Sequence, residues 1–146
     1  MRWCLISGNQ EKIATARMYI DIEAEDIDCP EIQSKDVAEI AAFSAEWAAN
    51  RLQRPVIKND CAFEIDAWNG FPGPFVAFVE RWIDAAGFLN IMQGVPNRKA
   101  QFRDATAVCL PGEKAKVFTS VTEGVILTEP SGEHGWALDK IFAIDG

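Results

Sequence analysis

The chain has 146 residues, which is enough for one domain with a single sizeable hydrophobic core. Its apolar fraction of 49% and charged fraction of 25% are those of a globular protein, which excludes a disordered or collagen-like chain. With 22 acidic residues against 14 basic ones, the net charge is −8, which argues against a broad basic face for a nucleic acid polymer.

Residues 3–6 are a short apolar run that predicts a buried strand, and Ser7, Gly8 and Asn9 predict a turn directly after it. Asn9 has a side chain suited to cap a helix that continues to about residue 18. Alternating apolar and polar residues over 19–23 then predict a second strand.

Residues 34–52 are the clearest predicted helix, because apolar side chains recur there at steps of three and four residues. We assign this apolar stripe to the core. Its members are Val37, Ile40, Phe43 and Trp47. The next apolar run begins at residues 55–57 and predicts a strand, with residues 61–67 as its continuation or its partner.

Residues 69–74 predict a tight turn stiffened by prolines, and residues 75–92 predict a helix that is interrupted near Gly87. We assign the apolar stripe of this helix to the core, while an exposed part of it would suit a dimer contact. The stripe consists of Phe75, Phe78, Val79 and Trp82.

Two long alternating runs, residues 101–110 and 116–127, flank Pro111 and Gly112 and predict a β-hairpin. A small basic cluster at the start of the hairpin reads as a solvated edge that discourages further strand pairing. The cluster is Arg98, Lys99 and Arg103. Helices between the early strands and a later hairpin together predict a mixed α/β sheet in a single domain, residues 1–146.

The cysteines and the single histidine, His134, limit the metal chemistry. One histidine excludes a His-rich zinc site. The cysteines lie far apart without a CxxC pair, so we expect buried thiols in a reducing compartment, and a zinc site would need four isolated ligands to converge. They are Cys4, Cys29, Cys61 and Cys109. Because no apolar run is long enough for a signal-peptide core or a membrane span, we predict a soluble, cytoplasmic protein without a membrane partner.

The turn at residues 7–9 is the first candidate site. A strand that enters a turn of small residues and opens a helix directs backbone N–H groups and the positive helix end toward an anion. Lys12 lies one helical turn further on, within reach of the same anion. The alternative, and commoner, interpretation is a capped helix with a solvated lysine.

Two carboxylates stand where a metal ion could be held. Glu31 follows Pro30 in a predicted loop, and Asp60 ends an apolar strand just before Cys61. Mg²⁺ usually takes one or two protein carboxylates and completes its coordination with phosphate oxygens and water. The spacing alone does not select these two among the 22 acidic residues.

Five segments spread over nearly the whole chain carry further information. They are S-G-N-x-x-K at residues 7–12, P-E-I-Q at 30–33, P-V-I-K-N-D-C at 55–61, N-G-F-P-G-P-F at 69–75, and P-S-G followed by G-W-A-L-D-K-I-F within 130–142. In this order they resemble the motifs of the inosine triphosphate pyrophosphatase family, whose members hydrolyse deaminated purine nucleoside triphosphates to monophosphate and pyrophosphate.

The resemblance implies an elongated mixed α/β sheet with flanking helices, in two lobes around a central nucleotide cleft, assembled as a homodimer. It implies a Mg²⁺-dependent pyrophosphohydrolase acting on substrates such as ITP, XTP and dITP. The implied catalytic residues are Asp60, Glu31 and Lys12, with Glu31 and Asp60 as the metal ligands and one of them helping to activate the attacking water. The implied substrate-binding residues are Ser7, Gly8, Asn9, Lys12, Cys61, Trp136 and Asp139.

The first departure from the family pattern concerns a cation. The family carries a helix lysine that reaches the phosphates, whereas counting from the neighbouring motifs puts Phe43 or Ser44 at its position. Neither side chain supplies a positive charge. Lys35 or Lys58 are the candidates to replace that lysine in space.

The other departures concern the metal and the base. Asn59 stands where the family has an acid, the base-flanking loop has Ala137 and Leu138 in place of a glycine and an aromatic residue, and Ser131 replaces an arginine. The sequence ends at residues 145–146, before the family's S-H-R segment, so we expect part of the base pocket to be missing unless a partner chain supplies it. We therefore expect altered base selectivity. The alternative is a non-catalytic descendant that binds a nucleotide or a protein partner.

Overall fold

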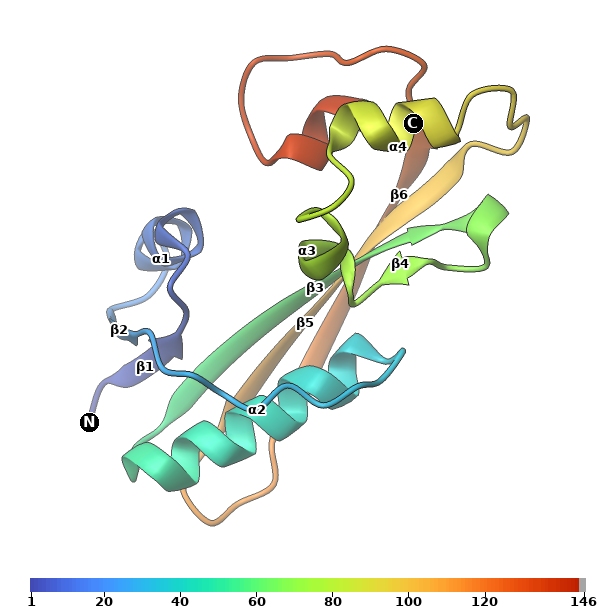
Figure 1. Ribbon diagram of the computed structural model, residues 1–146. Helices are drawn as coiled ribbons and strands as arrows, with labels where there is room; N and C mark the ends of the chain where they lie inside the picture. The colour runs from blue at the N-terminus through green and yellow to red at the C-terminus, as the bar shows by residue number, and fades with distance from the viewer. Residues whose placement is uncertain (145–146) are drawn as a thin grey trace. The chain divides into compact units, whose positions relative to one another are not determined.

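The computed structural model describes residues 1–144, and the predicted end of the chain at residues 145–146 lies outside this part. Seven strands form one mixed sheet in the order β2-β1-β3-β5-β6-β7, with β4 paired to β3, and helices flank it (Figure 1). Within residues 1–144 no helix is long and apolar enough to cross a membrane. The elements are β1 (Trp3–Ile6), α1 (Gln10–Arg17), β2 (Ile22–Glu25), α2 (Val37–Leu52), β3 (Val56–Ile65), η1 (Asp66–Trp68), β4 (Pro72–Gly73), α3 (Val76–Val79), α4 (Ala85–Ile91), β5 (Lys99–Cys109), β6 (Lys116–Ile126), η2 (Ala137–Ile141) and β7 (Phe142–Ile144).

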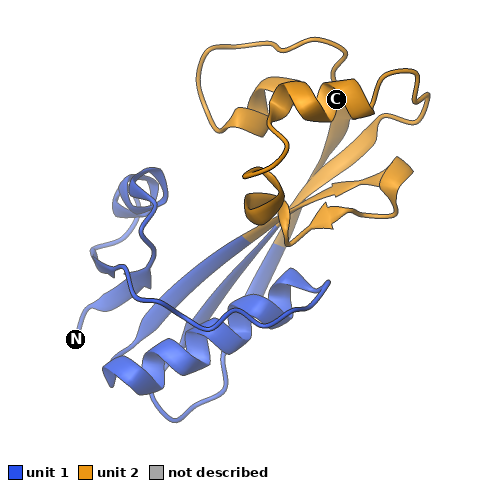
Figure 2. Cartoon of the chain, viewed as in Figure 1, with its two compact units in different colours: residues 1–60, 104–119 blue, residues 61–103, 120–146 orange. Residues whose placement is uncertain are grey.

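The chain divides into two compact units (Figure 2). Unit 1 holds residues 1–60 and 104–119, and unit 2 holds residues 61–103 and those from 120 onward. The predicted mixed sheet with flanking helices is confirmed, whereas the single domain and the central cleft stay predictions.

Unit 1 begins with three parallel strands. The strand predicted at residues 3–6 is confirmed as β1, and it pairs in parallel with β2 on one side and β3 on the other. The second strand starts later than the predicted residue 19, because the backbone N–H groups of Tyr19 and Ile20 still donate to the carbonyl of Ala16 and continue the end of α1. The alternation over residues 19–23 was therefore the wrong signal for the start of this strand.

Helix α2 buries a different face from the predicted one. Asp36 caps it by accepting a hydrogen bond from the N–H of Ala38 at 2.9 Å, so the helix starts at Val37 and not at Ser34. Phe43 is 42% exposed and Trp47 is only partly buried, so the prediction of both as core residues was wrong. The buried face is made mostly of small residues, which allow a helix to approach its neighbours closely. Its members are Val37, Ile40, Ala41, Ser44, Ala45, Ala48 and Ala49.

Unit 2 replaces the long helix predicted for residues 75–92 with two short ones, α3 and α4. The break lies before Gly87, because Asp84 caps α4 and accepts from the N–H of Gly87 at 2.8 Å. The predicted apolar stripe is mostly exposed, with Phe78 at 58% and Trp82 at 79%, so its assignment to the core was wrong. A helix of only four residues, as α3 is, cannot bury such a stripe along its length.

The predicted hairpin is confirmed as β5 and β6, but the basic cluster at its start is not a solvated edge. The Arg98 guanidinium donates to the carbonyls of Met92, Ile126 and Leu127 at 2.8, 2.7 and 2.6 Å. Arg103 pairs with Glu64 at 3.1 Å. The sequence could not reveal these partners, because most of them lie more than 25 residues away from the arginines.

Candidate functional site

The candidate site in unit 1 lies where β1 ends. Strand β1 pairs with β3 only through Cys4 with Val56 and Leu5 with Ile57. Because the two strands are parallel and in this register, Lys58 lies level with Ile6, and residues 59–60 of β3 continue beyond the last residue of β1, beside the turn that leads into α1. The carboxyl ends of neighbouring parallel strands are where open α/β sheets bind their ligands.

The turn at residues 7–9 has the capped geometry that the sequence predicts. The Asn9 Oδ1 accepts from the N–H groups of Glu11 and Lys12 at 2.9 and 3.1 Å, and the Ser7 Oγ accepts from the N–H of Asn9 at 3.1 Å. Lys12 is not simply solvated, because its Nζ donates to the carbonyl of Asn59 at 3.3 Å. The structure thus brings the turn that holds Ser7 and Asn9, through Lys12, to the middle of β3.

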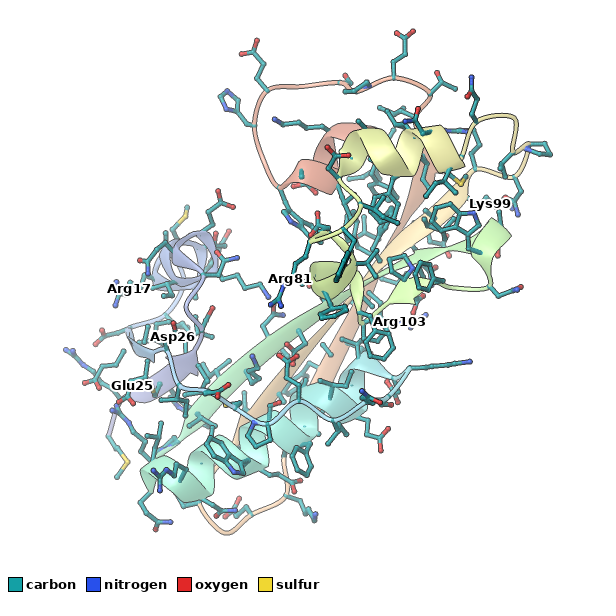
Figure 3. All side chains as sticks on the ribbon, in the orientation of Figure 1. Arg17, Glu25, Asp26, Arg81, Lys99 and Arg103 are labelled. Atoms are coloured by element: carbon teal, nitrogen blue, oxygen red, sulfur yellow. The ribbon has the colours of Figure 1, made fainter. Side chains whose placement is uncertain are left out.

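Gly8 lies against Asp26. Asp26 is the first residue after β2 and is labelled in Figure 3. A Cβ atom at Gly8 would lie 2.5 Å from the Asp26 Oδ2, so a larger residue at this position would push the Asp26 carboxylate aside. Sequence reasoning missed Asp26. The signal that could have found it is its position, because β1 and β2 are parallel neighbours and the residues after both strands lie at the same edge of the sheet.

Lys58 and Asp60 point to one side of β3, as alternate residues of a strand do. Lys58 Nζ lies 3.6 Å from Asp60 Oδ1, and the two side chains are only 14% and 19% exposed. The other oxygen, Asp60 Oδ2, is buried and accepts no hydrogen bond from the described residues. Asn59 points the other way and donates to Thr106 Oγ1 at 3.0 Å on β5, so its amide does not join Asp60.

Glu31 is an exposed loop residue. The charged groups that act on the thiol of Cys29 indicate which residues surround this loop. Burial raises the pKa of Cys29, the charge of Lys58 lowers this pKa, and the charges of Asp60, Asp28 and Glu31 raise it. Since all four charged groups act on one thiol, the Glu31 loop runs near the Lys58–Asp60 pair.

The metal chemistry of this region is that of carboxylate oxygens. Across residues 1–144, no three side chains of His, Cys, Asp or Glu gather as a metal site, which leaves no cysteine zinc site there. The unpartnered Asp60 Oδ2 is a hard oxygen donor without a proton donor of its own. One such oxygen, with Glu31 on the neighbouring loop, fits a Mg²⁺ ion that takes most of its ligands from phosphate and water.

Unit 2 brings two predicted base-binding residues together. The backbone N–H of Trp136 donates to Asp139 Oδ2 at 2.7 Å at the start of η2. The indole of Trp136 is half-buried, and its ring centroid lies 6.0 Å from that of Phe102. The Asp139 side chain is exposed. Leu138 is fully buried in the core of the unit. Cys61, also in unit 2, is partly buried and donates to the carbonyl of Ala62 at 3.7 Å.

Glu80, which sequence reasoning also missed, belongs with this pair. Burial raises the pKa of Glu80 to about 7, although a hydrogen bond donated by the Trp136 indole lowers it, and the charge of Asp139 raises it further. The Glu80 carboxyl therefore changes its charge near neutral pH. No local sequence signal marks it, because Trp136 lies far away along the chain.

Three comparisons with known proteins agree on the family that this chain resembles. A model of the Ham1 family matches residues 3–146. A dITP/XTP pyrophosphatase of Methanopyrus kandleri is 41% identical over 138 residues, covering 94% of this chain and 73% of that protein. A dITP/XTP pyrophosphatase of Methanothermobacter marburgensis is 36% identical, covering 100% of this chain and 80% of that protein. The structure of the Staphylococcus aureus Ham1 protein, 28% identical, superposes with a TM-score of 0.79 over 99% of this chain and 81% of its own. The predicted family resemblance is confirmed.

Proposed function

This chain belongs to the Ham1 family, and from that membership we propose that it is a nucleoside triphosphate pyrophosphohydrolase acting on deaminated purine nucleotides such as dITP and XTP. The observation that carries the proposal is the capped turn at residues 7–9, with Lys12 directed toward the middle of β3, which bears Asp60. The names of the relatives support the same reaction class.

In this reaction water attacks a phosphorus atom, the bond from that phosphorus to its bridging oxygen breaks, and pyrophosphate leaves with that oxygen. The N–H groups at the start of α1 and the Lys12 ammonium bind the negative oxygens of the triphosphate. Asp60 Oδ2, which has no hydrogen-bond donor among the described residues, accepts the proton of the attacking water.

Asp60 and Glu31 would hold a Mg²⁺ ion, which when bound supplies positive charge for the phosphates and a water molecule of lowered pKa. Trp136 and Asp139 would border the base. Because Leu138 is buried in the core and offers no ring to a purine, base choice depends on Trp136, on Asp139 and on residues outside η2, which is why we propose altered base selectivity.

We expect pyrophosphate release from dITP, XTP and ITP in the presence of Mg²⁺. Lys12→Met should lower kcat/KM by about 10- to 100-fold, because a cation facing the triphosphate is lost. Lys99→Met, which changes an exposed lysine of unit 2, is the matched control and should act like the wild type. Tight binding of a non-hydrolysable triphosphate without turnover would instead favour the non-catalytic descendant. A protein that shows no binding and no turnover would refute both functions.

We further propose that the protein is a homodimer. Unit 2 exposes three large aromatic side chains near α3, and such a patch in water favours association with another surface. They are Phe75, Phe78 and Trp82. The second copy of the chain is the partner that would cover them.

Trp82→Glu should therefore shift the protein from dimer to monomer in sedimentation velocity runs at micromolar concentration, with a loss of dimer affinity of at least about 10-fold. Tyr19→Glu is the control, since Tyr19 in unit 1 is equally exposed at 79% and lies outside the patch. A wild-type protein that sediments as a monomer at every concentration would contradict the dimer.

A further inference from the structure

Lys58 and Asp60 form an unusual ion pair for a strand that borders a binding site. The Nζ–Oδ1 distance of 3.6 Å is long for a charge-assisted hydrogen bond, although both side chains are more than four-fifths buried. A buried lysine needs a compensating negative charge, and here it has only one oxygen of Asp60 among the described residues. The pair is therefore held by charge more than by good hydrogen-bond geometry.

A second lysine reaches the same strand. Lys12 Nζ is 3.3 Å from the carbonyl of Asn59, the residue between Lys58 and Asp60. Two ammonium groups thus lie at neighbouring positions of β3, next to the capped turn that would receive phosphates. Among the described residues, Asp60 forms an ion pair only with Lys58. Its second oxygen, Oδ2, accepts no hydrogen bond from residues 1–144.

We infer that Lys58 has two successive partners: it neutralises Asp60 in the substrate-free protein, and it releases Asp60 and binds a phosphate oxygen when the metal–triphosphate complex enters. The inference rests on the proposed function and deepens it, because it assigns the substrate's phosphates a second lysine. A lysine suits this exchange, since its flexible four-carbon stem carries three donors that can be redirected without moving the backbone.

The exchange has two opposite consequences. In the substrate-free protein Lys58 competes with a divalent cation for Asp60, so removing its charge should strengthen metal binding. At the phosphates the same charge is attractive, so removing it should weaken triphosphate binding. A lysine that only supports the fold would not produce two shifts of opposite sign.

The experiment measures both shifts in the substrate-free, full-length protein. Binding of Mn²⁺, followed by electron paramagnetic resonance, should be about 5- to 10-fold tighter in Lys58→Met than in the wild type. Binding of inorganic triphosphate at saturating Mn²⁺, followed by calorimetry, should be about 10-fold weaker. Lys58→Arg keeps the charge and should restore triphosphate binding.

Lys114→Met is the matched control, because it removes another lysine of unit 1 that pairs with a carboxylate, Glu46 at 3.1 Å. It should change neither affinity. If Lys58→Met fails to fold by circular dichroism, Lys58→Gln removes the charge while keeping a donor for Asp60, and the same two shifts are expected.

Unchanged or weaker Mn²⁺ binding in the folded variant overturns the inference, and so does unchanged triphosphate binding. If the wild type hydrolyses dITP while Lys58→Met shows neither shift, only this inference fails. If the wild type neither binds triphosphate nor hydrolyses any nucleotide, the proposed function fails and the inference falls with it.

Discussion

Asp60→Asn should lower kcat for pyrophosphate release from dITP by at least about 100-fold, with a much smaller change in KM. The reason is local. Asp60 is the carboxylate on the strand that extends past β1, and its buried Oδ2 has no hydrogen-bond donor within residues 1–144. Asparagine has nearly the same shape, but its amide can neither accept the proton of the attacking water nor hold a divalent cation with a full negative charge.

Initial rates of pyrophosphate release, with dITP at saturation and at low concentration, measure this effect. Glu31→Gln should have a weaker effect than Asp60→Asn, because Glu31 is exposed on a loop and water can take its place. Asp21→Asn is the control: Asp21 is an acid of the same unit whose side chain is 74% exposed in an ion pair with Arg2. An Asp60→Asn protein that keeps half of the wild-type rate would remove Asp60 from the proposed chemistry.

Glu80→Gln should stabilise the protein at alkaline pH and leave it unchanged in acid. The pKa of Glu80 is raised to about 7 in the folded protein, so the folded state holds the proton more tightly than the unfolded state does. The stability that this proton provides is fully present below the unfolded value of 4.5 and is lost as the pH rises through about 7. At pH 8.5 the ionised carboxylate therefore costs about 2 kcal/mol of unfolding free energy, less than the full conversion of the shift because Glu80 is partly exposed.

Urea unfolding of wild type and variant at pH 5 and pH 8.5 measures this difference directly. Glutamine keeps an oxygen that accepts from the Trp136 indole, so the variant isolates the charge of Glu80 from its hydrogen bond. Glu123→Gln, at an exposed position of β6, should show equal stability differences at both pH values. A Glu80→Gln variant that gains as much at pH 5 as at pH 8.5 would mean that burial of the side chain, and not its charge, is the cause.

The parts of the fold that sequence patterns predicted well depend on short-range physics. Strand β1, the Asn9 cap of α1 and the hairpin of β5 and β6 each follow from side chains within a few residues of one another. The errors at Phe43 and Trp82 have a common origin. Apolar side chains at helical spacing indicate an apolar face, but tertiary packing decides whether that face is buried, and it buried alanines in α2 instead.

The candidate site divides in the same way. The turn at residues 7–9 was predictable from local chemistry, and the family resemblance selected Asp60 from many carboxylates. The Lys58–Asp60 pair follows from strand alternation once β3 is known to be one continuous strand. Asp26 and Glu80 were not predictable from the sequence. Asp26 lies next to Gly8, and Glu80 next to Trp136, only in the folded chain. The roles of Cys61, Trp136 and Asp139 in substrate binding stay predictions, as does the cytoplasmic location.

The three carbonyls held by Arg98 have a consequence for how unit 2 opens. They belong to the end of α4 and to the end of β6 and the residue after it, segments that ordinarily fray first and independently. A single guanidinium bound to both makes their fraying one event, since neither end can open far without breaking bonds that also hold the other. Slow hydrogen exchange should therefore extend to these two ends as a shared, cooperative block.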